Sequence, residues 1–189
     1  MLRSLGLGPS VGAREGATRW GTVPRVSTLP SYAEIAALPS YSDRPVPVAF
    51  EDINGHMNVR YYLGIASEGL DEALTEVGIP TNWVEKGFAI FSAEHHLTYV
   101  AELLTGDAVS VRVLLVGRSE RALHVVVYLL DDTREQISCV VEEICLHMDM
   151  SARKTSPWPD DVAAQIDARV EEHRALDVEP TLSDSMSLR

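Results

Sequence analysis

Cysteine is scarce in this chain, and so is positive charge. The two cysteines, Cys139 and Cys145, lie six positions apart in one strand-like run. On a strand that separation is about 20 Å, which is too long for a disulfide, so we expect free thiols and a reducing, cytoplasmic location. The 16 Lys and Arg residues against 28 Asp and Glu residues give a net charge of −12. This balance argues against nucleic acid or an anionic membrane surface as a partner.

Long apolar runs are missing as well. No stretch of about 18 apolar residues occurs, so we expect no transmembrane helix. Hydrophobic residues make up 46% of the chain and charged residues 23%, as in ordinary globular proteins. The length of 189 residues suits one domain with a sizeable core.

The ends of the chain lack apolar periodicity. Residues 1–29 are rich in Gly, Ser and Arg, which is typical of a disordered tail. Four arginines against one glutamate in this tail leave a mitochondrial-type targeting peptide open as an alternative. Ser31 and Glu34 predict a capping box on a short helix that Pro39 stops. The expected organisation is a disordered tail at 1–29, the short helix and a linker at 30–45, one domain at 46–176, and a second disordered tail at 177–189.

The central domain is predicted to contain a strand, a long helix and then a meander of four strands. Apolar residues recur at helical spacing over 58–77, and Gly78 ends that helix. The alternation slips near Glu142 and Glu143, which predicts a β-bulge. Because the long helix must cover one face of the meander, the sheet should curl around it, giving an α+β fold with an added C-terminal helix that begins near Asp160. The expected strands are 46–50, 88–100, 108–116, 123–129 and 137–148.

Residues 52–58, with the sequence DINGHMN, gather a carboxylate, an amide and an imidazole directly before the long helix. Asn54 and Gly55 form a turn dipeptide. A helix N-terminus favours negative charge, either on Asp52 or on a reacting carbonyl oxygen, and such a place can support hydrolysis. The alternative is that Asp52 and Asn54 only cap the helix and that His56 only packs.

Residues 52–58 resemble the signature of hot-dog fold acyl-CoA thioesterases of the 4-hydroxybenzoyl-CoA thioesterase type, and the Asp-x-Asn-x-His pattern also resembles plant acyl-acyl carrier protein thioesterases. Residues 97–107 resemble the end of that family's second strand and its Gly-Asp turn, and the likeness covers about 46–159. It implies a five-stranded antiparallel sheet wrapped around the helix. It also implies homodimers joined edge to edge, sometimes homotetramers, with the thioester at the subunit interface. The pattern further resembles carnitine-associated thioesterases that act on betainyl-CoA.

The resemblance gives roles to individual residues. Asp52 matches the catalytic carboxylate, which either attacks the thioester carbonyl or activates a water. The backbone N–H of Val59 matches the donor that polarises the carbonyl oxygen. Asn54 and His56 match a plant-type amide and imidazole that orient substrate, water or Asp52. Glu102 matches a carboxylate of the plant-type enzymes, with a solvated glutamate at a strand end as the alternative.

The resemblance also implies where the substrate lies. Coenzyme A, which enters as part of the substrate, would meet basic residues at the turn between the third and fourth strands and at the end of the fifth. Those residues are Arg118, Arg121, Arg153 and Lys154, with ordinary charged turn residues as the alternative. The aromatic residues expected to line the acyl pocket are Tyr61, Tyr62, Trp83, Phe88 and Phe91.

Neither a metal nor a redox cofactor is expected. Glu94, His95 and His96 are adjacent, but strand alternation puts His95 on the opposite face from the other two residues, so they do not form one metal site. We therefore expect a homo-oligomeric acyl-CoA thioesterase for a short or medium acyl chain, with betainyl-CoA as one candidate substrate. Two alternatives stay open: a hot-dog dehydratase or hydratase acting on acyl thioesters, and an acyl-CoA-binding module without catalysis.

Overall fold

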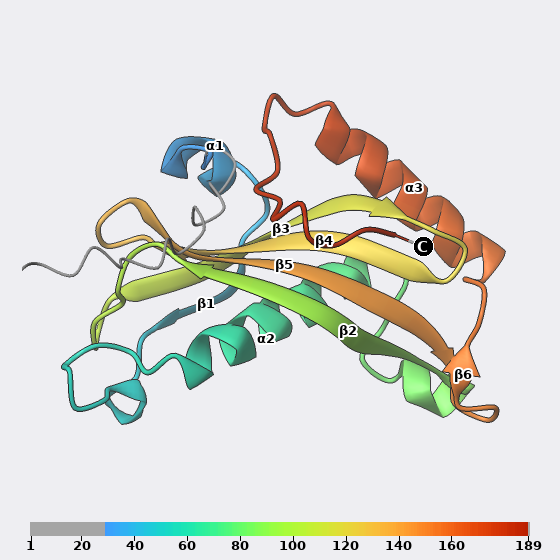
Figure 1. Ribbon diagram of the computed structural model, residues 1–189, viewed down its shortest axis with the longest axis horizontal. Helices are drawn as coiled ribbons and strands as arrows, with labels where there is room; N and C mark the ends of the chain where they lie inside the picture. Colours follow the sequence, from blue (N-terminus) through green and yellow to red (C-terminus); the bar gives the residue numbers. More distant parts are fainter. Residues whose placement is uncertain (1–28, 189) are drawn as a thin grey trace, which may run out of the picture.

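The protein is a single curved antiparallel sheet with its longest helix, α2, packed on one face (Figure 1). A computed structural model describes residues 29–188, so the expected tail at 1–29 lies outside the described residues except for Leu29. The strand order is β1-β3-β4-β5-β2, and β6 is a two-residue addition to β5. The strands are β1 (Tyr41–Pro45), β2 (Phe88–Tyr99), β3 (Ala108–Arg118), β4 (Ala122–Asp131), β5 (Gln136–Asp149) and β6 (Lys154–Thr155). The α-helices are α1 (Tyr32–Ala36), α2 (Arg60–Glu76) and α3 (Asp160–Arg174).

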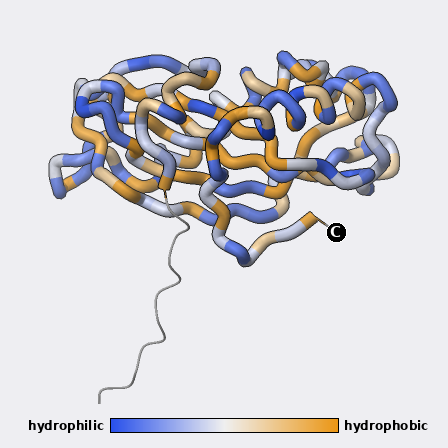
Figure 2. Tube along the Cα trace, turned by 90° about the horizontal axis from the view of Figure 1, so that it is seen from above, coloured by the Kyte–Doolittle hydropathy of each residue, from blue (hydrophilic) through white to orange (hydrophobic). Residues whose placement is uncertain are grey.

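The larger core lies between α2 and the sheet. The apolar stripe of α2 buries Ile65, Leu70 and Ala73 against inward-facing residues of the central strands. Figure 2 shows hydrophobic residues running through the body of the molecule. Helix α3 packs against β3, and its apolar residues join the same core. The predicted α+β fold, a five-stranded antiparallel sheet around one long helix with an added C-terminal helix, is confirmed.

A second core covers the opposite, outer face of the sheet. It contains Ile35 and Leu38 from the α1 region and Tyr128 from β4. Residues 177–188, part of the segment expected to be a disordered tail, cross this face (Figure 1). The backbone N–H of Thr181 donates to the Tyr128 hydroxyl at 2.9 Å, and Thr181 is buried. Both faces of the central strands are therefore covered, which explains why every residue of β4 is buried.

Two details of the strand prediction are wrong. The first strand is β1 at Tyr41–Pro45, and 46–50 instead contains a 3-10 turn at Val48–Phe50. Pro45 and Pro47 lack the backbone N–H donors that a strand at 46–50 would need. Strand β1 pairs with β3 although its own sequence has no apolar alternation.

No bulge occurs at Glu142 and Glu143. Both residues stay in register with β2 and β4. Glu142 is buried on the outer face and Glu143 on the inner face. Two adjacent polar residues therefore interrupt the apolar pattern of the sequence, although the strand keeps its register. The nearest register shift falls on β2, between Ser92 and Glu94.

Strand β2 forms one edge of the sheet. It pairs with β5 and with no other strand among residues 29–188, and residues 91–96 are exposed. An open edge of this length presents unpaired backbone groups that favour pairing with another strand. Within the same described part of the chain, the helices are too short or too polar to cross a membrane.

Candidate active site

The loop before α2 is a closed turn that fixes the position of Asp52. The Asp52 N–H donates to the His56 carbonyl at 3.0 Å, and the Gly55 N–H donates back to the Asp52 carbonyl at 3.0 Å. Gly55 has a φ of +80°, a conformation that favours glycine. The Met57 N–H donates to the Leu103 carbonyl at 2.7 Å, which ties the loop to the segment after β2. The two segments that resemble the thioesterase family are thus held together.

The Asp52 carboxylate is oriented by neighbouring amide groups. Its Oδ1 accepts a hydrogen bond from the Asn54 backbone N–H at 2.8 Å, and its Oδ2 lies 3.5 Å from the Asn58 amide nitrogen. The Asn58 side chain also accepts from the Arg60 N–H at 3.1 Å, in the first turn of α2. Asn58 therefore links the carboxylate to the helix N-terminus, where the helix dipole favours negative charge.

Val59 supplies a backbone donor at the start of α2, on the wall of the cavity described below. Its backbone is already helical, with φ −51° and ψ −29°. Its N–H makes no hydrogen bond with any of residues 29–188. A free N–H at a helix start can stabilise an oxyanion, as the sequence resemblance implies for Val59.

A cavity of about 210 Å³ opens next to the loop. His56 lies on its wall, with its Nδ1 3.9 Å from Asp52 Oδ1. Tyr62 and Tyr99 form another part of the wall, with ring planes at 87° and centroids 5.2 Å apart. The Tyr62 hydroxyl accepts from the Leu103 N–H at 3.2 Å. The lining residues are His56, Met57, Val59, Tyr62, Tyr99, Val100, Ala101 and Glu102.

The structure brings most of the expected catalytic residues together. His56, Val59 and Glu102 line one cavity at the start of α2, and the Asp52 carboxylate lies 3.9 Å from the His56 ring. Asn54 is exposed and contacts Asp52 through its backbone N–H, whereas the side-chain amide next to the Asp52 carboxylate is that of Asn58. Sequence reasoning did not single out Asn58 as a site residue, although it ends the 52–58 motif.

Of the aromatic residues expected to line the acyl pocket, Tyr62 lines the cavity beside the loop. Tyr61 instead stacks on Phe50, with centroids 3.8 Å apart, and Arg60 covers its ring. Phe91 is exposed on β2. Trp83 and Phe88 line a second cavity, of about 200 Å³, at the other end of β2. The second aromatic residue on the wall of the first cavity is Tyr99, beside Tyr62. Tyr99 lies in the segment 97–107 that resembles the family, but it was not expected to line the pocket.

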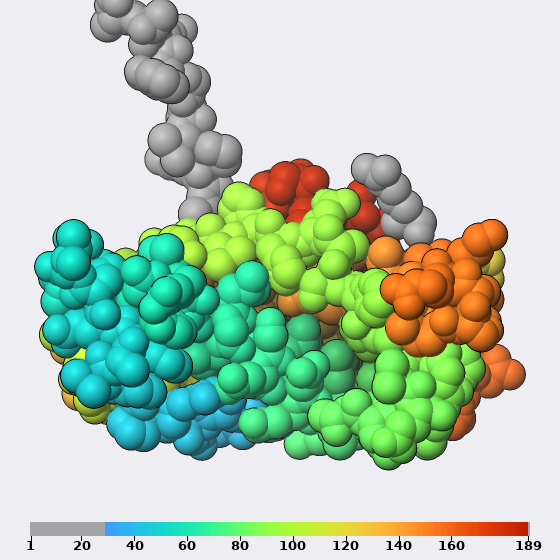
Figure 3. Space-filling view, turned by 90° about the horizontal axis from the view of Figure 1, so that it is seen from below, coloured from blue at the N-terminus to red at the C-terminus, as the bar shows by residue number. Residues whose placement is uncertain are grey.

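The four basic residues expected to meet coenzyme A lie far from Asp52 within one chain. Figure 3 shows the Asp52 loop (cyan) and the β5–β6 region (orange) at opposite ends of the molecule. Lys154 is in β6 and Arg153 precedes it with a φ of +50°. Arg121 follows the β3–β4 turn and pairs loosely with Glu120 at 3.5 Å. Arg118 is bound by the Asp167 carboxylate of α3 at 2.5 and 2.7 Å, so its charge is already balanced.

The histidines of β2 are distributed as alternation predicts. His95 pairs with Glu143, and its Nε2 lies 3.3 Å from that carboxylate on the inner face. His96 pairs with Glu142, which binds His124 at 2.9 Å. Residues 29–188 contain no group of three or more His, Cys, Asp or Glu side chains arranged to hold a metal ion.

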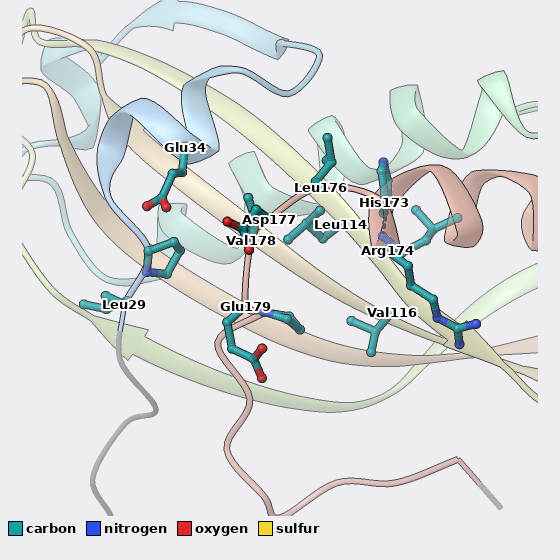
Figure 4. A pocket seen from close by; sticks show the side chains of 13 residues that line it. Leu29, Glu34, Leu114, Val116, His173, Arg174, Leu176, Asp177, Val178 and Glu179 are labelled. Carbon is teal, nitrogen blue, oxygen red and sulfur yellow. Dashed lines mark hydrogen bonds between the residues drawn. The ribbon is translucent and has the colours of Figure 1, made fainter.

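A larger cavity, of about 630 Å³, lies elsewhere on the molecule (Figure 4). It is lined by β3, the end of α3, the segment that follows α3, and residues at the start of the α1 region, and Leu114, Val116 and Leu176 contribute apolar side chains. His173 also faces it, and its Nδ1 accepts from the Leu115 N–H at 2.9 Å. None of the loop residues 52–58 lines this cavity.

Comparison with known proteins relates both fold and sequence to thioesterases. The family model described as thioesterase-like superfamily matches residues 46–166. A betainyl-CoA thioesterase of Pseudomonas aeruginosa is 30% identical over 137 residues, covering 72% of this chain and 86% of that protein. An L-carnitine dehydrogenase/betainyl-CoA thioesterase of Rhizobium meliloti is 29% identical over 135 residues, covering 71% of this chain but 27% of that longer protein.

The fold also matches solved structures. A Staphylococcus aureus protein determined in complex with CoA superposes with a TM-score of 0.69 at 20% identity, covering 78% of this chain and 92% of that one. The matched family segment begins directly after β1 and ends within α3. It therefore includes the Asp52 loop, α2 and the whole meander. This chain is therefore a hot-dog fold protein that belongs to the thioesterase-like superfamily.

Proposed function

We propose that this protein hydrolyses an acyl-CoA thioester to the free acid and coenzyme A, with Asp52 as the catalytic carboxylate. The proposal rests on one arrangement at the start of α2. The free Val59 N–H belongs to a residue that lines a cavity together with His56, and the His56 ring lies 3.9 Å from the Asp52 carboxylate. A carboxylate and an oxyanion donor on one helix end are the two groups that thioester cleavage needs.

The chemistry can follow two courses, both of which need an ionised carboxylate. In one, Asp52 takes a proton from water, the water oxygen attacks the carbonyl carbon, and the C–S bond breaks as the sulfur receives that proton. In the other, a carboxylate oxygen attacks the carbonyl carbon, the thiolate leaves, and water then cleaves the resulting anhydride. In both, the Val59 N–H stabilises the oxygen that becomes negative. Asn58 and His56 hold the carboxylate and the approaching group in place.

The arrangement of charges supports a site built by two chains. The twelve residues of β2 span about 36 Å, with Asp52 near the Tyr99 end and Lys154 near the Phe88 end. One chain therefore does not hold both ends of the same substrate. Antiparallel pairing of β2 with a second β2 would set Tyr99 beside the partner's Phe88 and would also close the exposed edge.

In this homodimer, each Asp52 would act on a thioester whose phosphates meet the partner's β5–β6 turn. Arg153 and Lys154 are the better candidates for phosphate binding, with Arg121 beside them, because Asp167 already neutralises Arg118. Pairing of two dimers into a homotetramer would leave this composite site unchanged.

The relatives' names favour a small cationic acyl group, as in betainyl-CoA, and the cavity of about 210 Å³ is large enough for a short acyl chain. The two free cysteines, both buried, suit a reducing compartment such as the cytoplasm. Burial raises the pKa of Cys139 to about 12, so this thiol stays protonated and takes no part in the chemistry.

The experiment is thiol release from a panel of acyl-CoA thioesters, comparing the wild type with Asp52→Asn. We expect a loss of about 10²–10⁴-fold in kcat for Asp52→Asn, the usual contribution of a catalytic acid or base. Asp161→Asn, an exposed aspartate in the first turn of α3, is the matched control and should keep wild-type activity. Equal rates for the wild type and Asp52→Asn would remove Asp52 from the mechanism.

The same panel separates the competing functions. Addition of water to an enoyl-CoA without thiol release would identify a dehydratase or hydratase. Saturable binding of acyl-CoA without any product would identify a binding module.

A further inference from the structure

The cavity beside Asp52 combines aromatic rings with a carboxylate. Tyr62 is buried and Tyr99 is about half exposed, and their planes meet at 87°, so the two rings form a corner. A cation is attracted to the face of a tyrosine ring within about 6 Å of its centroid, and both rings line this cavity. Burial raises the pKa of Tyr62 and of Tyr99, so both hydroxyls stay neutral and the rings keep their ordinary character.

Glu102 adds an unbalanced negative charge to the same cavity. It lines the cavity and is exposed, and its carboxylate makes no hydrogen bond or ion pair with any of residues 29–188. Arg60, at the start of α2, is directed to the Tyr61 ring and hydroxyl. The cavity thus carries a carboxylate that a positively charged ligand would complement.

The chemistry of the acyl group fixes where a cation must lie. In a betaine-type thioester, the quaternary nitrogen is two bonds from the carbonyl carbon. A group that recognises this nitrogen must therefore line the same cavity as the reacting carbonyl. Tyr62, Tyr99 and Glu102 share the cavity with Val59, whose N–H is the proposed oxyanion donor, and with His56, which lies 3.9 Å from Asp52. They therefore meet this condition when the thioester carbonyl is bound at the Val59 N–H.

We infer that Tyr62, Tyr99 and Glu102 form the recognition site for a quaternary ammonium group on the acyl chain, so that they determine specificity. This inference rests on the proposed thioesterase function and adds the residues that select its substrate. Glu102 then acts by attracting the cationic acyl group, not by handling the attacking water.

A neutral isostere tests this role without interference from general losses of activity. In 3,3-dimethylbutanoyl-CoA, carbon replaces the charged nitrogen of betainyl-CoA while the shape stays the same. The readout is the ratio of kcat/KM for betainyl-CoA to kcat/KM for the isostere, measured within each variant. Any change in folding or in the rate of hydrolysis affects both substrates and cancels in this ratio.

We expect the wild type to prefer betainyl-CoA, and Glu102→Gln and Tyr99→Leu each to lower the ratio by roughly tenfold, as loss of one charge or one cation–π contact implies. Asp71→Asn is the matched control, because Asp71 lines the second cavity, with Trp83 and Phe88. Its ratio should equal that of the wild type.

The outcomes separate this inference from the proposed function. If the wild type hydrolyses both thioesters at equal kcat/KM, or if Glu102→Gln and Tyr99→Leu keep the wild-type ratio, the recognition site is wrong while the thioesterase function stands. A lowered ratio in Asp71→Asn would also overturn it in favour of the second cavity. If the wild type releases no thiol from any acyl-CoA, the proposed function itself fails. If Glu102→Gln is inactive on both substrates, the ratio measured for Tyr99→Leu still tests the recognition site.

Discussion

Gly69 lies in the middle of α2 at a point where the helix backbone touches the sheet. A Cβ built on Gly69 would lie 2.5 Å from Val111 Cγ1 and 2.6 Å from Val111 Cβ. Ordinary carbon contacts are about 3.5–4.0 Å, and a change of the Val111 rotamer moves Cγ1 but not Cβ. Gly69→Ala must therefore push α2 away from β3. Overpacking of this kind costs about 1–3 kcal/mol, and we expect the upper part of this range.

Gly64 is the matched control in the same helix. Nothing lies within 4 Å of a Cβ built there, so Gly64→Ala gains the helix propensity of alanine, about 1 kcal/mol, without a clash. The same gain offsets part of the cost at Gly69, leaving a net loss of about 2 kcal/mol. The two variants should therefore differ by about 3 kcal/mol.

The assay is urea unfolding of both variants at one protein concentration, because the proposed dimerisation would make stability depend on concentration. We expect the midpoint to fall for Gly69→Ala and to rise for Gly64→Ala. Thiol release should also fall in Gly69→Ala, because a displaced α2 moves the Val59 N–H relative to Asp52. If Gly69→Ala were as stable as Gly64→Ala, the close approach of α2 to β3 would be refuted.

Two further predictions concern stability. Burial, with a smaller contribution from Arg169, lowers the pKa of His173 in the folded protein. The stabilisation by the neutral His173 ring is therefore complete above the unfolded-state pKa of about 6.5, and it is lost as the pH falls below that value. The free energy of unfolding should decrease more on acidification below about pH 6.5 in the wild type than in His173→Gln, and parallel pH profiles of the two proteins would contradict this. Tyr128→Phe removes the hydroxyl that binds Thr181 through its N–H at 2.9 Å and its Oγ1 at 3.3 Å. The loss should be about 1–3 kcal/mol in urea unfolding, with faster proteolysis within 177–188, and an unchanged midpoint would show that this segment adds no stability.

The sequence predicts the elements whose patterns are set locally. Helix α2 is predicted at 58–77 and observed at Arg60–Glu76, because its apolar stripe and the terminating Gly78 both lie in the local sequence. The meander strands are predicted for the same reason. Strand β1 is missed because its pairing depends on β3, more than sixty residues later, and not on any alternation of its own.

The positions of the candidate site residues could be predicted where a motif contains them, but not where the fold brings distant segments together. Asp52, His56 and Val59 lie in or next to the 52–58 motif and gather at one end of α2. The ion pair between Arg118 and Asp167 forms because α3 packs back against β3, and no local sequence pattern predicts this packing. Tyr99 joins Tyr62 because the strand end and the helix start are brought together by the Met57–Leu103 hydrogen bond.

Mixing two inactive variants tests most directly the claim that Asp52 of one chain acts on a substrate held by the basic residues of its partner. One variant is Asp52→Asn, and the other is Arg153→Ala combined with Lys154→Ala, assayed at a substrate concentration well below KM. When the two are unfolded together and refolded, each mixed dimer has one site with Asp52 and both basic residues intact. Thiol release should recover to about one quarter of the wild-type rate, since about half of the dimers are mixed and each has one intact site. No recovery above the sum of the separate variants would contradict a site shared between two chains.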